Sequence, residues 1–422
     1  MKPPLHVLLA TLGSAGDIHP FLALGQALHA RGHRVTVLCP EVFGRLVQQA
    51  GLGVRAMGSR AEYEAVTQEP ALWDARKGFG IIWRHLRPGL RRLHDTLQAM
   101  PADERLLLVA HPLALPSADL CRALRPGLPI VGAYLAPQNL RTVHHPLKLG
   151  PLAVPAWVPM AWRRWAWRRI DQQLIDPLTV ADLNALRSPL GLPPIAHFVE
   201  HLQSVPDLSI TLFAPWFGLA QPDWPQPLVE GGFLLYDRPD SAVLAPELQA
   251  FLAAGPAPVV FTPGTGHQHA AAYFRAALQA VQRLGRRALF ITGHPEQLPA
   301  ALPPTVLALP YVSFRALLPQ AAALVHHGGI GTTAEALRAG VPQLVVPFAH
   351  DQFDNARRVQ TLGVGDALLA RRASAARLAQ RLQALLASPT LPARCAEVAA
   401  LAAAEQPLPR LCEAIEALAQ RA

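Results

Sequence analysis

The sequence predicts an α/β protein made of two doubly wound parallel-sheet domains. Short apolar runs alternate with helical stretches in both halves of the chain, and a proline-dense segment separates the two series. Strands of a parallel sheet are buried on both faces, which accounts for their nearly continuous apolar character. Ligands of such sheets bind beyond the carboxyl ends of the strands, so the loops that follow strands are the most informative about function.

The first half shows a strand–helix–strand order. A helix over residues 20–30 is expected to begin beside a proline and to end at Gly32, and a second helix is expected over 41–50. Residues 138–204 include a stretch rich in proline and tryptophan, which should be followed by a long helix through Leu186. The expected strands cover residues 5–11, 33–39, 53–57, 105–110 and 128–135.

The second half repeats this alternation after the proline-dense residues 206–232, which are typical of an inter-domain linker. The expected strands cover residues 257–262, 287–292, 305–310, 322–327 and 342–347. The expected helices cover residues 269–284, 332–339, 352–361, 374–387 and the tail to 421.

Domain boundaries follow from these two series. We predict an N-terminal domain over residues 1–217, a linker over 218–235 and a C-terminal domain over 236–405. The two domains are expected to face one another across a cleft. Residues 406–422 are expected to form a helix that packs back on the N-terminal domain.

Composition narrows the possible ligands. The 422 residues include 38 Lys and Arg against 29 Asp and Glu, a formal net charge of +9, which suits diphosphates, nucleic acid or an anionic membrane. The basic residues are scattered without a nucleic-acid motif, so no nucleic-acid partner is predicted. The four cysteines have no zinc or disulfide spacing. No apolar run is long enough to span a membrane, and we expect a cytoplasmic protein, with peripheral attachment to the inner membrane left open.

The densest motif, HHGGIGTTAEALRAGVPQ, begins where an expected strand ends at His326. Gly328, Gly329 and Gly331 allow the backbone to approach a ligand closely, and the helix opened by Thr332 offers unpaired N–H groups in its first turn. These features together predict an anion site suited to a diphosphate. His326 is expected to donate a hydrogen bond to a phosphate oxygen, and Thr332 to donate through its hydroxyl and its backbone N–H.

A second polar motif, HDQ, follows the next expected strand and contains Asp351 and Gln352. A carboxylate beside a carboxamide can hold vicinal sugar hydroxyls, because both groups accept hydrogen bonds and the amide also donates them. Phosphates at one loop and a hexose at the next indicate a nucleotide-sugar ligand.

These motifs resemble the donor signature of the UDP/TDP-sugar glycosyltransferases of the GT-B fold, which contains two Rossmann-like domains. GSAGDIHPF (13–21) resembles that family's N-terminal acceptor loop, and FTPGTG (261–266) resembles the first loop of its C-terminal domain. The resemblance covers nearly the whole chain. Further stretches resemble the rhamnosyltransferases of rhamnolipid synthesis: EPALWDARKGFGIIW (69–83), DWPQPL (223–228), LLPQAAALVHHGGIG (317–331) and PFAHDQFDNA (347–356).

The resemblance implies a role for each donor-site residue. His326 would bind the α-phosphate, Gly331 and Thr332 the β-phosphate, and Thr265 would add a further phosphate contact. The donor sugar is a co-substrate, and the resemblance implies neither a cofactor nor a metal.

The same resemblance extends to the sugar and the base of the donor. Asp351 and Gln352 would hold the sugar. Tyr311 and Val312 match the segment that flanks the base, by ring stacking and backbone hydrogen bonds.

The catalytic base is expected in the N-terminal loop. Asp17 occupies the position where many family members place a catalytic histidine or aspartate, and His19 is the second candidate. An aspartate of ordinary pKa near 4 is a weak base. We expect partial burial against an apolar acceptor to raise the pKa of Asp17 toward a useful value. Ser14 of the same loop is expected to contact the acceptor.

Tryptophan and arginine are interleaved in WVPMAWRRWAWRRI (157–170). One interpretation is a partly buried helix with a solvated basic face. The other is an amphipathic lid that covers a lipid acceptor or rests on an anionic membrane. In the second interpretation, the acyl chains would contact Trp157, Trp162 and Trp165.

The sequence thus predicts an inverting, metal-independent glycosyltransferase that moves a hexose onto a hydroxyl of a small apolar acceptor. The resemblance implies TDP-L-rhamnose as donor and a β-hydroxyalkanoyloxyalkanoate as acceptor, giving a mono-rhamnolipid. UDP-sugars, and other acceptors such as a natural product or a sterol, stay open. The alternatives are a nucleotide-sugar epimerase of the same fold, a non-catalytic protein that retains the fold, and a dinucleotide oxidoreductase, which the first turn LGSAGD disfavours because it lacks GxGxxG.

Overall fold

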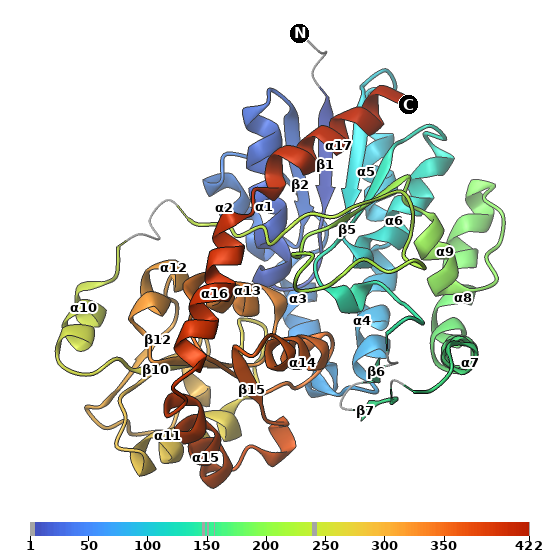
Figure 1. Cartoon of the computed structure of the whole chain (residues 1–422). Helices are drawn as coiled ribbons and strands as arrows, with labels where there is room; N and C mark the ends of the chain where they lie inside the picture. Colours follow the sequence, from blue (N-terminus) through green and yellow to red (C-terminus); the bar gives the residue numbers. More distant parts are fainter. Residues whose placement is uncertain (1–4, 146–147, 150–151, 156, 239–242, 422) are drawn as a thin grey trace. The chain divides into compact units, whose positions relative to one another are not determined.

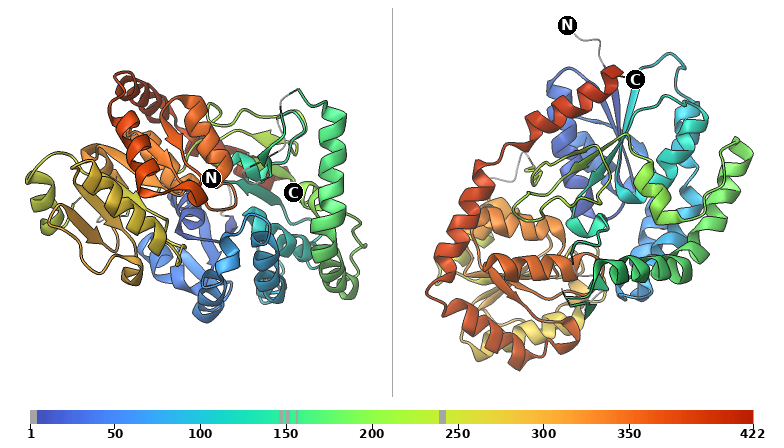
Figure 2. Two further views of the ribbon diagram at one scale, coloured as in Figure 1. Left: turned by 90° about the horizontal axis from the view of Figure 1, so that it is seen from below. Right: turned by 45° about the vertical axis from the view of Figure 1, so that its right-hand side comes forward.

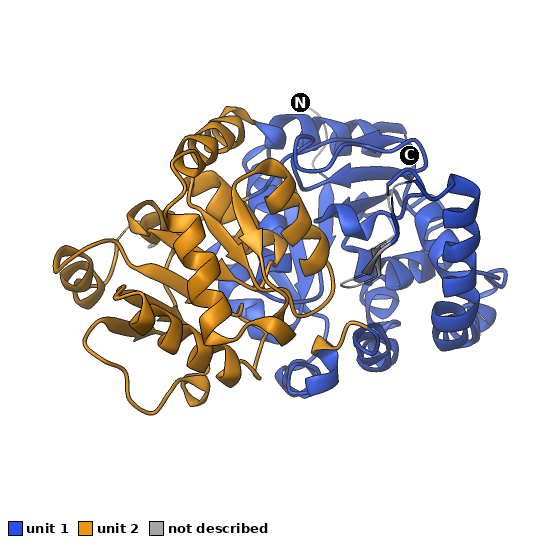
Figure 3. Cartoon of the chain, turned by 60° about the horizontal axis from the view of Figure 1, so that its bottom comes forward, with its two compact units in different colours: residues 1–72, 76–234, 406–422 blue, residues 73–75, 235–405 orange. Residues whose placement is uncertain are grey.

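The computed structural model of the chain describes residues 5–145, 148–149, 152–155, 157–238 and 243–421. They form two compact units (Figures 1 and 3). Unit 1 contains Met1–Leu72, Arg76–Leu234 and Gln406–Ala422, and unit 2 contains Trp73–Ala75 and Leu235–Glu405. The sequence prediction placed residues 218–234 in a separate linker, whereas the structure includes them in unit 1.

Unit 1 is built on a seven-stranded parallel sheet whose central strands are fully buried. One face of β1 and β4 presents Leu8 and Leu108 to Leu93, Leu97 and the helix that contains Ala118. Burial on both faces explains the continuous apolar runs in the sequence. The strand order is β3 (Gly53–Ala56), β2 (Arg34–Cys39), β1 (His6–Ala10), β4 (Leu106–Ala110), β5 (Ile130–Tyr134), β8 (Leu208–Thr211) and β9 (Leu228–Val229).

The helices of unit 1 flank this sheet (Figure 1). The first helix, α1 (Ala15–Ala30), begins five residues before the predicted start and contains Pro20. The ring of Pro20 is buried, so the one backbone hydrogen bond that proline forfeits is offset by packing. The other helices of unit 1 before residue 235 are α2 (Gly44–Gln49), α3 (Arg60–Thr67), α4 (Gly78–Leu86), α5 (Arg92–Gln98), α6 (Leu115–Leu120), α7 (Met160–Ile170), α8 (Asp176–Arg187) and α9 (Phe198–Ser204); β6 (Lys148–Leu149) and β7 (Leu152–Ala153) form a short antiparallel pair.

Unit 2 repeats the architecture with six parallel strands. Their order is β12 (Val306–Leu309), β11 (Ala288–Ile291), β10 (Val259–Thr262), β13 (Ala323–His326), β14 (Gln343–Val345) and β15 (Gly365–Ala367). The helices are α10 (Pro246–Ala253), α11 (Ala271–Arg283), α12 (Phe314–Leu317), α13 (Ile330–Ala339), α14 (Gln352–Leu362), α15 (Ala375–Leu386) and α16 (Leu391–Ala404). These elements confirm the predicted fold class of two Rossmann-like domains.

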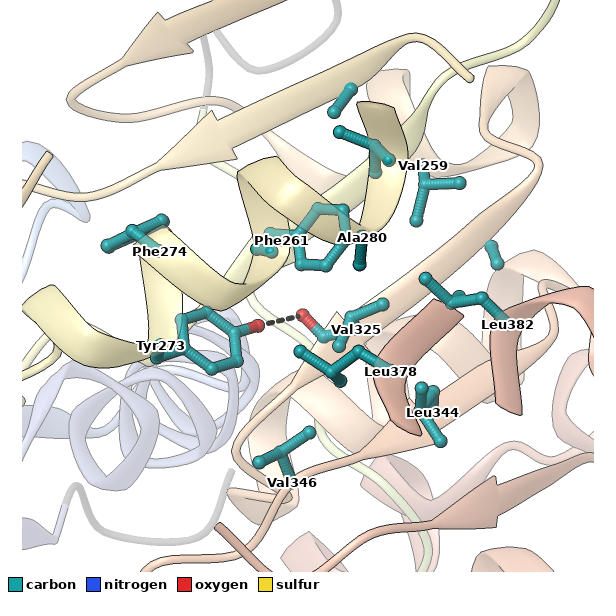
Figure 4. Close-up of a cluster of buried hydrophobic side chains, with 14 of the residues drawn as sticks. Val259, Phe261, Tyr273, Phe274, Ala280, Val325, Leu344, Val346, Leu378 and Leu382 are labelled. Carbon is teal, nitrogen blue, oxygen red and sulfur yellow. Dashed lines mark hydrogen bonds between the residues drawn. The ribbon is translucent and has the colours of Figure 1, made fainter. Parts of the chain in front are cut away.

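Alternate residues of the unit 2 strands face two separate cores. Phe261 and Val325 pack with Phe274 of α11 on one face (Figure 4), whereas Val260 and Leu324 pack into the core on the other. The Tyr273 hydroxyl donates to the Val325 carbonyl at 2.8 Å, so the one polar atom of this ring is satisfied inside the apolar layer.

The predicted linker over residues 206–232 is wrong in its secondary structure, because this segment contains β8 and β9. Gly231 N–H donates to Thr211 Oγ1 at 3.0 Å and ties the segment to the sheet. The two-residue strand β9 follows Pro227 and lies at the sheet edge, where a residue without an N–H is tolerated. The proline-dense segment therefore contains an edge strand of unit 1, and the boundary between the two units follows it, at Leu234.

The last helix, α17 (Pro407–Arg421), belongs to unit 1 and contacts α1 (Figures 1 and 2). Arg31 donates to Glu416 through Nε at 2.6 Å and through Nη2 at 2.9 Å. His33 Nε2 lies 3.0 Å from the same carboxylate, and Arg105 donates to the Ala419 carbonyl. The hydrogen bond from Arg31, and less strongly that from His33, outweighs partial burial and lowers the pKa of Glu416 to about 2.

Glu416→Gln should lower the free energy of unfolding near neutral pH by on the order of 2 kcal/mol, since charge-assisted hydrogen bonds are lost. Because the pKa of Glu416 is lower in the folded chain than its ordinary value of 4.5, the stabilisation is complete above about pH 4.5 and is lost as the pH falls toward 2. Urea unfolding from about pH 7 to pH 3 measures this difference.

The matched control is Glu413→Gln, an exposed residue of the same helix. An equal loss in both variants, or a wild-type advantage that does not shrink at acid pH, would contradict the role assigned to Glu416.

Candidate functional site

The loop after β1 holds Asp17 in a fixed position in unit 1. Asp17 Oδ2 accepts a hydrogen bond from Ser14 N–H at 2.6 Å and one from Ser14 Oγ at 3.0 Å. Gly13 has φ +125°, and a Cβ at this position would lie 2.3 Å from Asp17 Oδ2. Glycine is therefore required for the carboxylate of Asp17, in the first turn of α1, to fold back on the preceding loop.

His111 is the polar partner of Asp17 that the sequence analysis missed. Its Nε2 lies 3.6 Å from Asp17 Oδ1, an ion-pair distance that is too long for a hydrogen bond. The Leu113 N–H donates to His111 Nδ1 at 3.1 Å, so in the neutral ring the proton resides on Nε2 and points toward Asp17. One signal could have found it: His111 directly follows β4, and β4 pairs in parallel with β1.

The protein groups around Asp17 lower its pKa, and the upward shift expected from an apolar acceptor stays a prediction. Burial by itself raises this pKa, but His111 and the two Ser14 donors together hold it below the ordinary value of 3.8. Asp17 is therefore a carboxylate throughout the physiological range. His19 lies in the second turn of α1, and its role as an alternative base stays a prediction.

His326 cannot meet a ligand as predicted. It is fully buried at the end of β13, with Nε2 at 3.0 Å from Gln343 Oε1 and Nδ1 accepting from Gly328 N–H at 3.2 Å. Burial lowers its pKa to about 4, partly opposed by the hydrogen bond with Gln343. Because both ring nitrogens are engaged inside the protein, the prediction that His326 donates to a phosphate is wrong.

The next residue, His327, lies against two glycines of unit 2. A Cβ at Gly264 would lie 2.6 Å from the His327 ring, and a Cβ at Gly329 would lie 2.3 Å from it. Burial lowers the pKa of His327 to about 3, with a smaller contribution from His326, so the ring is neutral near pH 7. Among the described residues, no group forms a hydrogen bond with its Nδ1.

The turn leads into α13, whose first backbone N–H groups lack partners within the helix. Gly331 and Thr332 lie half-buried in this first turn. β10 pairs with β13, so the exposed Thr265 stands in the loop that neighbours the turn. The structure thus brings together the glycines and hydroxyls that the sequence predicted for an anion site, and their binding roles stay predictions.

The HDQ motif adjoins this turn through Asn355, which the sequence analysis missed. Asn355 Nδ2 donates to the Gly328 carbonyl at 2.9 Å and to Asp351 Oδ2 at 2.8 Å. Gln352 is 3% exposed, and its Oε1 accepts from the N–H groups of Phe348 and Ala349 at 2.8 and 3.0 Å. The prediction that the Gln352 oxygen accepts from sugar hydroxyls is therefore wrong, whereas Asp351 remains half-buried at the start of α14.

The predicted base-flanking residues differ in exposure. Tyr311 is 49% exposed after β12, and the guanidinium of Arg238 lies 4.5 Å from its ring centre. The side chain of Val312 is buried in the core with residues of β11, and the backbone hydrogen bond to a base stays a prediction. Asp237 accepts hydrogen bonds from both Arg315 and Arg338, which fixes the charges beside Tyr311.

A group of polar rings lies beside the turn and was not predicted; His267 is buried, Trp73 is half-buried and His350 is exposed. Trp73 belongs to unit 2, and its ring lies 4.5 Å from that of His267 and 5.9 Å from that of His350. Burial, and then the neighbouring His327, lowers the pKa of His267 to about 3. Within the described part of the chain, no hydrogen-bond partner reaches Trp73 Nε1 or either nitrogen of His267. Buried polar atoms of this kind mark a place where a ligand or water binds.

Comparison with known proteins identifies the family. Residues 7–86 match the glycosyltransferase family 28 N-terminal domain, and residues 287–418 match the erythromycin biosynthesis protein CIII-like C-terminal domain. The O-mycaminosyltylonolide 6-deoxyallosyltransferase of Streptomyces fradiae is 32% identical over 388 residues, covering 85% of this chain and 84% of that protein. The chain belongs to this glycosyltransferase family. A second relative, the vancomycin aglycone glucosyltransferase of Amycolatopsis orientalis, is 27% identical and covers 86% of this chain and 85% of its own.

Solved structures confirm the fold of this glycosyltransferase. The glycosyltransferase of kitacinnamycin superposes with a TM-score of 0.74 at 22% identity, covering 99% of this chain and 100% of its own. The calicheamicin glycosyltransferase CalG4 gives 0.71 at 24% identity, with 100% and 99% covered. The predicted GT-B fold is thereby confirmed. The family relationship described above confirms the predicted nucleotide-sugar-dependent glycosyltransferase activity.

His327→Ala should weaken the binding of a nucleoside diphosphate about tenfold, because one neutral donor beside the helix N-terminus is lost. His326→Ala should instead lower the free energy of unfolding by ~2 kcal/mol, because a buried hydrogen-bonded ring is removed. Calorimetry with TDP and UDP measures the first effect, and urea unfolding measures the second.

The exposed His269, in the loop after β10, provides the matched control as His269→Ala. Weaker binding in His326→Ala with unchanged binding in His327→Ala would reverse the assignment of the two histidines.

Proposed function

We propose that this glycosyltransferase inverts the anomeric carbon of its donor, with Asp17 as the base that receives the acceptor proton. The observation that carries this proposal is the environment of Asp17. Ser14 donates two hydrogen bonds to Oδ2 of Asp17. His111 lies beside Oδ1 and favours the ionised form of the carboxylate. A fixed, ionised carboxylate after β1 is suited to accept a proton from a hydroxyl.

The proposed step couples attack on the anomeric carbon to departure of the diphosphate. The acceptor oxygen forms a bond to the anomeric carbon while its proton moves to Asp17, and the bond to the diphosphate breaks with its electron pair on the leaving oxygen. A carboxylate of low pKa is a weak base, so we expect proton transfer to occur together with attack rather than before it. His111 then faces a protonated Asp17 and serves as its positioning residue.

The leaving diphosphate needs a compensating electrostatic environment. The first N–H groups of α13, the hydroxyls of Thr332 and Thr265, and the ring of His327 offer this without a metal ion. Asp351 is proposed to bind hydroxyls of the sugar, and Tyr311 to stack on the base with the face opposite Arg238.

The identities of the donor and the acceptor are proposed from the sequence resemblance to the rhamnosyltransferases. We propose TDP-L-rhamnose as donor and a β-hydroxyalkanoyloxyalkanoate as acceptor, giving a mono-rhamnolipid. Support comes from the sequence stretches that resemble the rhamnolipid rhamnosyltransferases. The Streptomyces relative is named as transferring a 6-deoxy sugar, which L-rhamnose also is.

Product analysis tests this function. Donor binding is ranked by calorimetry over TDP- and UDP-sugars, and the product made with a hydroxy-fatty acceptor is identified by mass and by the anomeric coupling in its NMR spectrum. The proposal expects a mono-rhamnolipid of inverted configuration, formed equally well with a chelator present. Retained configuration would contradict the mechanism, and an epimer formed from donor alone would favour an epimerase.

Asp17→Asn should lower kcat about 10³-fold, within the usual range for the loss of a general base. The affinity for TDP should stay nearly unchanged, because the amide keeps the shape of the side chain. Steady-state kinetics and calorimetry on the same preparation measure the two effects. Full turnover by Asp17→Asn would remove the base assignment, and His19→Gln is the companion variant that tests the second candidate.

The pH dependence of kcat/KM follows from the lowered pKa of Asp17. The base is active when deprotonated, so the acid limb that Asp17 causes should lie below about pH 4 in the wild-type enzyme. In His111→Phe the main group that lowers this pKa is gone and the burial remains, so the acid limb should move to higher pH. Ser14→Ala, which removes only one hydroxyl donor, should move it less. Superimposable profiles for wild type and His111→Phe would contradict the role of His111.

A further inference from the structure

The surface of α7 displays aromatic side chains that a folded protein would normally bury. Trp157, just before the helix, is 81% exposed, and Trp162 and Trp165 within it are 62% and 52% exposed. Met160 and, further along, Leu174 are also exposed, at 49% and 60%. Exposed apolar groups that lie together on one element indicate an interaction surface.

The exposure is confined to one side of α7. On the packed side, Arg163 is buried and donates to the Val143 carbonyl at 2.9 Å, and Trp167 Nε1 donates to the Thr142 carbonyl at 3.2 Å. On the other side, the rings of Trp162 and Trp165 contact each other edge to face at 5.2 Å. Arginine and tryptophan side chains are therefore hydrogen-bonded to the protein on one face of α7 and exposed on the other.

The outward face is also strongly basic. Within α7 there are four arginines and no acidic residue. Arg164, Arg168 and Arg169 are exposed, and the guanidinium of Arg169 lies 5.8 Å from the Trp165 ring centre. In the described ranges of the chain, no carboxylate forms an ion pair with Arg164 or Arg168. The outward face thus combines indole rings with unneutralised positive charge.

This combination matches the surface of an anionic phospholipid bilayer. Indole rings settle at the depth of the lipid headgroups, and arginines beside them meet the phosphates. A convex helix face with protruding rings suits a soft lipid surface, whereas a groove would suit a peptide. Among the described helices, none is both long and apolar enough to cross a membrane. Figure 2 shows the segment of α7 and α8, in green, along the periphery of unit 1.

We propose that the outward face of α7, formed by Trp162, Trp165, Arg164, Arg168 and Arg169, binds the surface of an anionic bilayer. Binding is interfacial, because the opposite face of the helix stays packed on the protein. The inference goes beyond sugar transfer and does not depend on which acceptor the enzyme uses.

Vesicle flotation of the full chain tests the proposal. The probes are vesicles of phosphatidylcholine alone and of phosphatidylcholine with about one third phosphatidylglycerol. The wild-type protein should float with the anionic vesicles and not with the neutral ones, its tryptophan fluorescence should shift to the blue, and about 0.5 M salt should weaken the binding. Failure to bind the anionic vesicles would overturn the proposal.

Two triple variants distinguish binding through the α7 surface from binding through the overall positive charge of the protein. Arg164→Gln/Arg168→Gln/Arg169→Gln should reduce partitioning about tenfold or more. The matched control, Arg371→Gln/Arg372→Gln/Arg377→Gln, removes the same charge from exposed positions of unit 2 and should reduce it less than about twofold. Equal losses in the two triple variants would mean that overall charge, and not α7, governs binding.

Trp162→Gln/Trp165→Gln tests the aromatic part and should also abolish the fluorescence shift. Thermal melting and TDP calorimetry should match wild type for every variant, because the changed side chains are exposed. If this double variant still floats with anionic vesicles but shows a raised KM for a short soluble acceptor, the face is a lid over the acceptor and the membrane proposal is wrong.

Discussion

The candidate donor site depends on the close approach of one histidine ring to two backbone segments. The ring of His327 fits only because Gly264 and Gly329 carry no Cβ, and either methyl group would come within 2.6 Å of it. Since β10 and β13 are neighbours in the sheet, the loops after them are forced together. The first turn of α13 then supplies N–H groups beside the ring. Replacing either glycine would displace the His327 ring from its position beside the turn and the N-terminus of α13.

Buried amides and histidines hold this arrangement in place. His326 and Gln343 are hydrogen-bonded across β13 and β14, Gln352 fastens the loop at residues 348–349, and Asn355 joins the turn to Asp351. His326 and Gln352, which the sequence analysis assigned to ligand binding, thus hold the backbone and side chains around the site in position. The hydrogen bonds of these side chains are made within the protein, which favours the neighbouring His327, Trp73 and His267 as the groups that a ligand would meet.

The sequence allowed the fold to be predicted because buried parallel strands are apolar throughout and glycine-rich turns follow them. The proline-rich segment was taken for a linker without strands, whereas it contains β8 and β9 of unit 1 and the boundary between the units follows it. The sequence pattern does not distinguish the two adjacent histidines, whereas the structure shows His326 fully buried and His327 half-buried. His111 was not predicted as the partner of Asp17, because the two residues are 94 positions apart in the sequence. Only the pairing of β1 with β4 brings them together. The pKa of Asp17 likewise depends on that partner and not on the loop alone.

The most direct test is a titration of ¹⁵N-histidine-labelled protein with a nucleoside diphosphate, followed through the ring nitrogen resonances. If His327 faces the diphosphate, its resonances shift as the ligand binds. Those of His326 keep their positions, because both of its nitrogens are engaged by Gln343 and Gly328. A shift at His326 with none at His327 would contradict the assignment on which the donor site rests.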